Sequence, residues 1–220
     1  MKVKVLRSLV IVMLLVLVVG IGIAAQPPQA GGQGAGGGRG AGSGSGRGGG
    51  QRGPAFTVTS SAWPDGGEVP QKYAGRGGNT SPAFEFSWMQ GTNPAMPPAN
   101  LMSYALIMHD IENAGRGGTS VDTLHWMIWD IPGDAKGLPE GIPMGDQPNG
   151  IKQSTTNVGR GGYFGPGAGA GPFHHYVFEF YALDTKLNLP DTATRDEVMA
   201  AMQMHIIGKA AFVGRFHATQ

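Results

Sequence analysis

The sequence predicts a mainly β domain that carries one α-helix late in the chain. Short segments rich in β-branched and aromatic residues recur between Gly, Pro and Asn, which is the pattern of strands separated by turns. A single clear helix-start signal, Thr194-Arg-Asp-Glu197, follows the main strand segments. Because a helix and a sheet each need a partner for their apolar face, we expect this helix to pack against the sheet.

Six segments carry the strand signal. They are residues 56–61, 83–88, 103–110, 123–131, 175–184 and 210–216. In the fifth segment both alternating sets of side chains are largely apolar, which is typical of a strand covered on both faces. We therefore expect residues 175–184 to form a central strand and residues 210–216 to form a closing one.

The helix signal is a capping box. The Thr194 hydroxyl and the Glu197 carboxylate can each accept a hydrogen bond from an amide that the helix leaves unpaired at its start. The following positions fall on one helical face: Val198, Ala201, Met202 and His205. Gly208 is the expected end of the helix.

The first 25 residues read as a secretory signal peptide. Lys2, Lys4 and Arg7 precede an apolar stretch over 9–19, and the small residues 20–25 suit cleavage before Gln26. The protein is therefore expected to be exported, either periplasmic or secreted. The alternative is an uncleaved membrane anchor, since residues 9–25 together form an apolar run of about 17 residues, which reaches the short end of the spanning range.

Composition then separates a linker from a domain. Residues 26–54 are dominated by Gly with Arg and Ser, a composition that cannot bury enough apolar surface to fold, so we expect a flexible linker. Residues 55–220 form the predicted globular domain.

The formal charge of +1, with 14% charged residues, gives no global attraction to nucleic acid or to an anionic membrane. The absence of cysteine excludes disulfides, thiolate metal sites and lipid attachment to a cysteine.

Several polar residues stand at the predicted strand ends. Asp110 ends one strand, His125 lies near the start of the next, and His174 and Tyr176 open another. If these strands are neighbours, the four side chains meet at one end of a sheet. Strict alternation places His125 on the same face as two apolar residues, Met127 and Trp129. A single histidine there would be an ordinary core residue, whereas several together favour a site.

The ordered motifs resemble the phosphatidylethanolamine-binding protein family, and its bacterial Raf kinase inhibitor-like branch in particular. The resemblance covers residues 56–216. It rests on Asn79-Thr-Ser-Pro82 leading to Trp88, Tyr104-Ala-Leu-Ile-Met-His-Asp110-Ile-Glu112, His125-Trp126 through Asp130-Ile-Pro132, Tyr163-Phe-Gly-Pro166, His174-His-Tyr176, Tyr181-Ala-Leu-Asp184 and the Gly208 to Phe216 ending. The resemblance implies an antiparallel β-sandwich with a small pocket near one end.

That pocket would accept phosphate, phosphorylethanolamine or a carboxylate-type anion. Matched residue by residue, the family's ligand-binding positions fall on Asp110, Glu112, His125, Gly165, Pro166, His174 and Tyr176. Two departures from the family pattern bear on the ligand. No proline stands between Asp110 and Glu112, and the Gly-Ala loop 167–171 lacks the family's paired prolines. Without prolines to fix its path, this loop should make a looser pocket mouth.

The resemblance favours a non-catalytic binding protein that needs neither a cofactor nor a metal. Beside an anion, Asp110 would fix the tautomer of His125, hold it protonated, or receive an ammonium group from the ligand. We expect binding to strengthen at mildly acidic pH, as His125 and His174 gain protons.

Two alternatives stay open. One is an extracytoplasmic protein-interaction or inhibitor module, of the protease or kinase inhibitor kind. The motif Gly-Arg-Gly-Gly recurs around Arg76, Arg116 and Arg160, which could be loop residues or cations at the rim of such a surface. The other is a metal-dependent hydrolase with ligands from separate strands, although no His-Glu-x-x-His, Gly-x-Ser-x-Gly or Walker motif is present.

Overall fold

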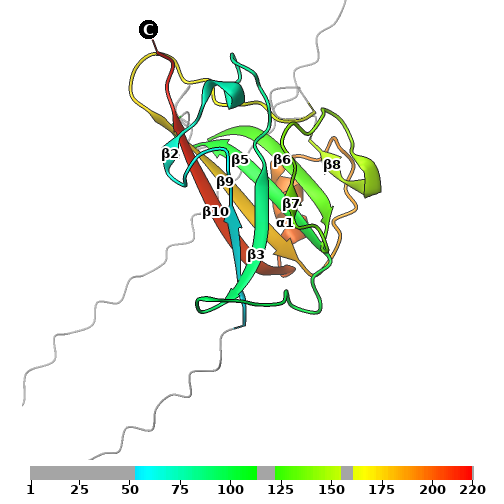
Figure 1. The fold of residues 1–220 in the computed structure, drawn as a ribbon. Coiled ribbons are helices and arrows are strands. Elements are labelled where there is room, and N and C mark those ends of the chain that lie inside the picture. The colour runs from blue at the N-terminus through cyan, green and yellow to red at the C-terminus, as the bar shows by residue number, and fades with distance from the viewer. Residues whose placement is uncertain (1–52, 113–121, 155–160, 220) are drawn as a thin grey trace, which may run out of the picture. The chain divides into compact units, whose positions relative to one another are not determined.

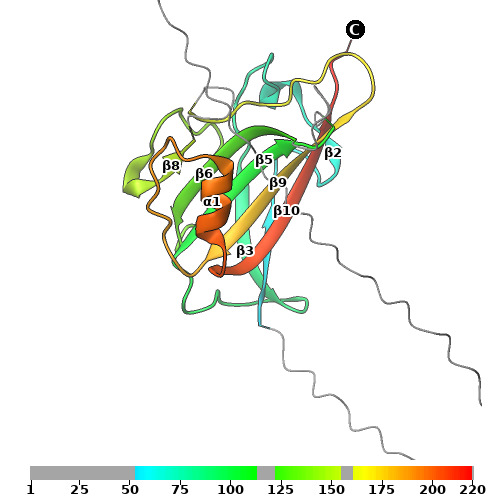
Figure 2. The same ribbon diagram turned by 180° about the vertical axis from the view of Figure 1, so that it is seen from behind.

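The computed structural model describes residues 53–112, 122–154 and 161–219. These residues form two sheets packed face to face, with one α-helix on the outside of the larger sheet (Figures 1 and 2). The predicted signal peptide and nearly all of the predicted linker lie outside the described residues, so these two boundaries stay predictions. Within the described part of the chain, no helix is both long and apolar enough to span a membrane.

The larger sheet has six strands in the order β2-β10-β9-β5-β6-β8. Their bounds are β2 Gly67–Glu68, β5 Ser103–Asp110, β6 Thr123–Pro132, β8 Lys152–Gln153, β9 His174–Leu183 and β10 Ile206–Phe216. All neighbours are antiparallel except the short parallel pair β2 and β10. The prediction that residues 175–184 form a central strand is confirmed, because β9 lies between β10 and β5.

The smaller sheet has four strands, and only its two longer members resemble the predicted segments. Its bounds are β1 Ala55–Thr59, β3 Phe84–Gln90, β4 Asn93–Pro94 and β7 Gly137–Leu138. β3 pairs with each of the other three. Short 3₁₀ helices at Gln71–Tyr73 (η1) and Pro148–Gly150 (η2) lie in the connections.

An aromatic core holds the two sheets together. Phe84 and Phe86 of β3 contact Phe180 of β9 with ring centroids 4.8 and 5.7 Å apart. Trp88 donates its indole N–H to the Tyr104 hydroxyl at 3.2 Å, which satisfies the polar atom of a buried ring. Such rings bury large apolar areas, so the interface between the sheets supplies most of the hydrophobic stabilisation.

A second core lies between the larger sheet and α1 (Arg195–Met202), which crosses the outer face of the sheet (Figure 2). Val198 and Met202 are fully buried there against Ile107 and Trp129. The capping box is confirmed, because the Thr194 hydroxyl accepts from the Glu197 amide while the Glu197 carboxylate accepts from the Thr194 amide. The sheet is thus covered on both faces.

The prediction that Gly208 ends the helix is wrong. The helix ends at Met202, and Gly208 lies inside β10. A Cβ at this position would come within 2.8 Å of the Trp88 ring, so the strand needs glycine where the two sheets approach closely. The same Cβ would lie 3.0 Å from the Cβ of Phe56 in β1. β1 therefore begins at the end of the sandwich where Gly208 lies.

We expect Thr194→Ala to lower the free energy of unfolding by about 1 kcal/mol, because it removes the helix cap. Urea denaturation monitored by tryptophan fluorescence measures this change. Thr192→Ala, at an exposed position two residues earlier, is the control and should change stability by less than about 0.5 kcal/mol. Equal effects of both substitutions would show that the cap contributes nothing.

Candidate ligand-binding site

A hollow of about 390 Å³ lies at the end of the larger sheet where β5 finishes and β9 begins. Antiparallel register sets Asp110, the last residue of β5, opposite Tyr176 on β9 and Thr123 on β6. Four predicted residues line the hollow: Asp110, His125, His174 and Tyr176. The expected convergence of these side chains at one sheet end is therefore what the structure shows.

Asp110 forms its principal contact with His174. The His174 ring donates from Nδ1 to Asp110 Oδ2 at 2.8 Å, and the Glu112 amide donates to Asp110 Oδ1 at 3.1 Å. The Asp110 side chain is only 3% exposed, whereas that of His174 is 29% exposed. A buried carboxylate thus orients a partly exposed imidazole at the surface of the hollow.

A backbone carbonyl orients the His125 ring. Its Nδ1 donates to the Phe164 carbonyl at 2.8 Å, so this carbonyl fixes the tautomer of the neutral ring. The Phe164 ring stacks on the imidazole at 5.4 Å, and the Tyr176 ring meets it edge-on at 5.1 Å. With Nδ1 engaged, Nε2 is an acceptor in the neutral ring and becomes a donor only on protonation.

A β-bulge brings His125 to the hollow. Along β6, Leu124 pairs with His109 and Trp126 pairs with Met108, which leaves His125 as the extra residue. The prediction that His125 shares a face with Met127 and Trp129 is therefore wrong, since those two side chains pack in the core beneath α1. Bulges commonly re-aim a side chain in this way, and strict alternation cannot anticipate them.

Burial changes the protonation behaviour of two residues in the hollow. Burial lowers the pKa of His125, although the Phe164 carbonyl and the Asp110 charge partly oppose this shift. Burial also raises the pKa of Tyr176, so this phenol stays protonated at physiological pH. The Tyr176 hydroxyl accepts hydrogen bonds from the amides of Gly167 and Ala168, each at 3.1 Å, and thereby holds the loop that closes the hollow.

The ligand contacts expected of Gly165 and Pro166 stay a prediction. Neither residue lines the hollow. Both form hydrogen bonds that connect the loop beside the hollow to the segment after η1. Gly165 donates to Asn79 Oδ1 at 2.9 Å, and the Pro166 carbonyl accepts from the Gly75 amide at 2.8 Å. A Cβ on Gly165 would lie 2.0 Å from the Tyr73 carbonyl oxygen, so close packing of two backbones explains the glycine.

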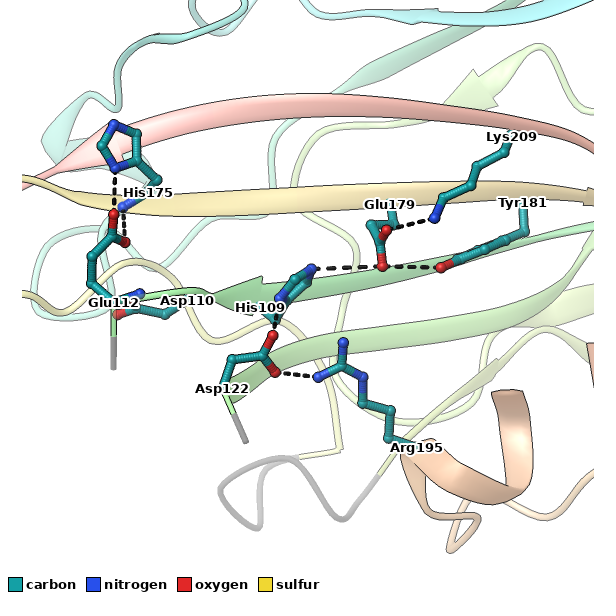
Figure 3. Close-up of polar contacts among 9 residues, drawn as sticks. All are labelled: His109, Asp110, Glu112, Asp122, His175, Glu179, Tyr181, Arg195 and Lys209. Atoms are coloured by element: carbon teal, nitrogen blue, oxygen red, sulfur yellow. Dashed lines mark hydrogen bonds and ion pairs between the residues drawn. The ribbon is translucent and has the colours of Figure 1, made fainter. Parts of the chain in front are cut away.

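Glu112 also lies outside the hollow. Its carboxylate accepts from the His175 amide and from His175 Nδ1, both at 2.6 Å (Figure 3). This pair is partly exposed and joins the end of β5 to the start of β9. Glu112 therefore supports the strand ends that carry Asp110 and His174 instead of lining the space between them.

Sequence reasoning missed several lining residues. Thr123, Phe164 and the loop residues 167–169 line the hollow together with Arg76. Thr123 could have been found from its place at a strand start opposite Asp110, and Phe164 from its place in the Tyr163-Phe-Gly-Pro166 motif. Arg76 was anticipated only as a rim cation, while Arg116 and Arg160 lie outside the described residues. Arg76 makes no hydrogen bond or ion pair with another described residue.

The end of the chain packs against the same loop. The Ala218 amide donates to the carbonyl oxygens of Ala168 and Gly169 at 3.1 and 3.3 Å. His217 Nδ1 donates to the Gly171 carbonyl at 2.8 Å. The Gly-Ala loop, which lacks the expected prolines, is thus held from two sides, by Tyr176 and by residues 217 and 218.

Across the described ranges, no group of three His, Cys, Asp or Glu side chains is placed to bind a metal ion.

The fold and the hollow define a β-sandwich protein with a polar pocket at one end of its larger sheet. The family model of phosphatidylethanolamine-binding protein matches residues 59–217. The chain therefore belongs to the phosphatidylethanolamine-binding protein family, a family of binding proteins.

Relatives and solved structures agree with this assignment. A UPF0098 protein of Methanothermobacter thermautotrophicus is 35% identical over 162 residues, which cover 73% of this chain and 98% of that protein. A Mycobacterium tuberculosis protein, described as a candidate lipoprotein, is 31% identical over 73% of this chain and 72% of its own length. The crystal structure of a Chlamydia trachomatis homologue of phosphatidylethanolamine-binding protein superimposes with a TM-score of 0.61 at 27% identity, covering 75% of this chain and 99% of that one.

The lowered pKa of His125 leads to a prediction that needs no ligand. Below its ordinary pKa of about 6.5, the unfolded chain takes up a proton at this position that the folded protein does not. The contribution of His125 to stability should therefore be complete above about pH 6.5 and fall as the pH drops towards the folded-state value. NMR titration of the His125 ring measures that value directly. A midpoint at or above 6.5 would contradict the prediction.

Proposed function

We propose that this protein is a non-catalytic binding protein that holds a small phosphate- or carboxylate-bearing ligand in the hollow beside Asp110. The observation that carries the proposal is the meeting of two imidazoles, a hydroxyl and a guanidinium that has no partner among the described residues, all around one space at the end of the sheet. Anions bind where several donors converge, and charged donors make the strongest of these hydrogen bonds. Membership in a family of binding proteins supports the same class of function.

The Asp110 carboxylate restricts which ligand fits. Alone, it would repel an anion, but its paired contact with His174 gives it a partner that can carry positive charge. A phosphate group near Arg76 would therefore be favoured, and an ammonium group on the same ligand could approach Asp110. Phosphate and the zwitterion phosphorylethanolamine share the anionic part and differ in the cationic part, so the two ligands distinguish these contributions.

The position of Arg76 also favours the pocket over the alternative of a protein-docking surface. Of the three arginines proposed for such a surface, Arg76 is the one within the described residues, and it lines the hollow. Its guanidinium makes no contact with another described residue that would have to be broken before a ligand binds. A planar donor group of this kind suits a phosphate.

Ligand binding should be linked to proton uptake. Because burial lowers the pKa of His125, the ring is neutral near pH 7, and an anion beside it would raise that pKa. We therefore expect phosphate affinity to increase as the pH falls from 7.5 to 5.5. Isothermal titration calorimetry in buffers of different ionisation enthalpy would show protons taken up on binding. Affinity that is equal or weaker at pH 5.5 would contradict the expectation.

Variants within the hollow supply the matching controls. Asp110→Asn, His174→Gln and Arg76→Gln should each weaken phosphate binding, with Arg76→Gln costing about tenfold or more, because a charge-assisted hydrogen bond is lost. His205→Gln is the matched control, since His205 Nδ1 donates to Asp184 Oδ1 at 2.8 Å in a His–Asp pair at the other end of the sheet. If the Asp110, His174 and Arg76 variants all bind phosphate as the wild type does, the hollow is not the binding site.

The proposal includes a location outside the cytoplasm. The cationic start and apolar stretch of residues 1–25 support export, and the candidate-lipoprotein description of the Mycobacterium tuberculosis relative is consistent with it. The chain has no cysteine, so a lipid could not be attached as in a bacterial lipoprotein.

Export can be tested by fractionating cells of the source organism. We expect the protein in the extracytoplasmic fraction, with an N-terminus at Gln26 found by mass spectrometry. A full-length N-terminus in the membrane fraction would instead support an uncleaved anchor. A full-length N-terminus in the cytoplasm would contradict export.

A further inference from the structure

A chain of polar contacts crosses the outer face of the larger sheet, on the side that carries α1 (Figure 3). Lys209 of β10 donates to Glu179 of β9 at 2.7 Å, and Glu179 lies 3.6 Å from Nε2 of His109 on β5. On its other side, the His109 ring contacts Asp122, which is also paired with Arg195 at the start of α1. This outer-face network therefore joins strands β5, β9 and β10 to the start of β6 and to the helix.

The outer-face network lies directly behind the hollow. Neighbouring residues of a strand point to opposite faces of a sheet. His109 therefore faces outward where Asp110 faces the hollow, and Asp122 faces outward where Thr123 lines the hollow. Asp110 and Thr123 are also register partners across β5 and β6. The contact between His109 and Asp122 thus clamps the same two strand ends from behind.

His109 is the central member of the network. The residue is 8% exposed, and each of its ring nitrogens faces a carboxylate oxygen, of Asp122 on one side and of Glu179 on the other. Only the doubly protonated imidazole can act as a donor towards both. Contact with His109, together with hydrogen bonds from Lys209 and Tyr181, lowers the pKa of Glu179 to about 2 despite its burial. Glu179 therefore stays ionised over the whole physiological range.

The charge of this network reaches the hollow. Beyond burial, which dominates, a positive charge on His109 is among the causes that lower the pKa of His125. No residue of the network lines the hollow itself. The outer-face network can thus affect the hollow in two ways, through the backbone of β5 and β6 and through the electrostatic effect of its charges on His125.

We propose that His109 is a positioning residue for the ligand pocket: by clamping β5 to β6 and β9 behind Asp110, it holds the Asp110–His174 pair in place for ligand. The proposal rests on the function proposed above. Breaking the clamp lets the strand ends separate and changes the surroundings of Asp110, so ligand affinity falls although no atom of His109 touches the ligand.

His109→Gln tests the proposal, because the amide can still donate to Asp122 but cannot carry a charge or engage both carboxylates. We expect the variant to bind inorganic phosphate about tenfold more weakly than the wild type, as for groups coupled through one network. The pH profile of phosphate affinity should also move, and so should the NMR titration midpoint of the His174 ring in the ligand-free protein. His205→Gln is the control and should leave all three measurements at their wild-type values.

A purely structural role would give a different result. In that case His109→Gln lowers the melting temperature, while phosphate affinity, the pH profile and the His174 titration stay as in the wild type, and the positioning proposal is overturned. If His109→Gln does not fold, Asp122→Asn weakens the same contact and is measured in the same way. If the wild type itself does not bind phosphate, the proposed function fails, whereas an unchanged His174 titration in His109→Gln still overturns the positioning proposal.

Discussion

The antiparallel register of β5, β6 and β9 is the constraint on which the rest of the site depends. It sets Asp110, Thr123 and Tyr176 at one level across three strands, so their side chains face a single space. A shift of one residue in any of these strands would turn its contribution to the opposite face. The buried aromatic residues between the sheets make such a shift costly, because it would expose them to water. Packing far from the site thus defines the geometry of the site.

The second requirement is a loop held close to the strand ends. The backbone of residues 165–168 is bound by the Tyr176 hydroxyl, the Asn79 side chain and the Gly75 amide. These contacts replace the conformational restriction that prolines would have given. They are hydrogen bonds to a Gly-Ala loop, which loses more conformational entropy on ordering than a proline-containing loop would. The shape of the hollow therefore depends on a loop that is positioned by its neighbours and not by its own sequence.

Much of the fold was predictable from the sequence because strand periodicity, turn residues and the capping box are local signals. Four pocket residues were also predictable, since each stands at a strand end and the ordered motifs resemble one family. The bulge at His125 was not, because it depends on how β6 pairs with β5. The outward position of Glu112 and the structural role of Gly165 also depend on contacts with distant residues. The network around His109 gave no sequence signal, since its members come from separate parts of the chain.

The two ends of the domain differ in their relation to the pocket. β1 begins beside Gly208, and the hollow lies at the level of Gly214, which pairs with Tyr176, about 20 Å further along β10 at the usual rise per residue. The last residues, in contrast, bind the loop that borders the hollow. A label on Ala55, the exposed first residue of β1, would therefore leave the opening of the hollow accessible, whereas a label on residue 217 or 218 would crowd it. Immobilisation for ligand screening is better made through the N-terminal side.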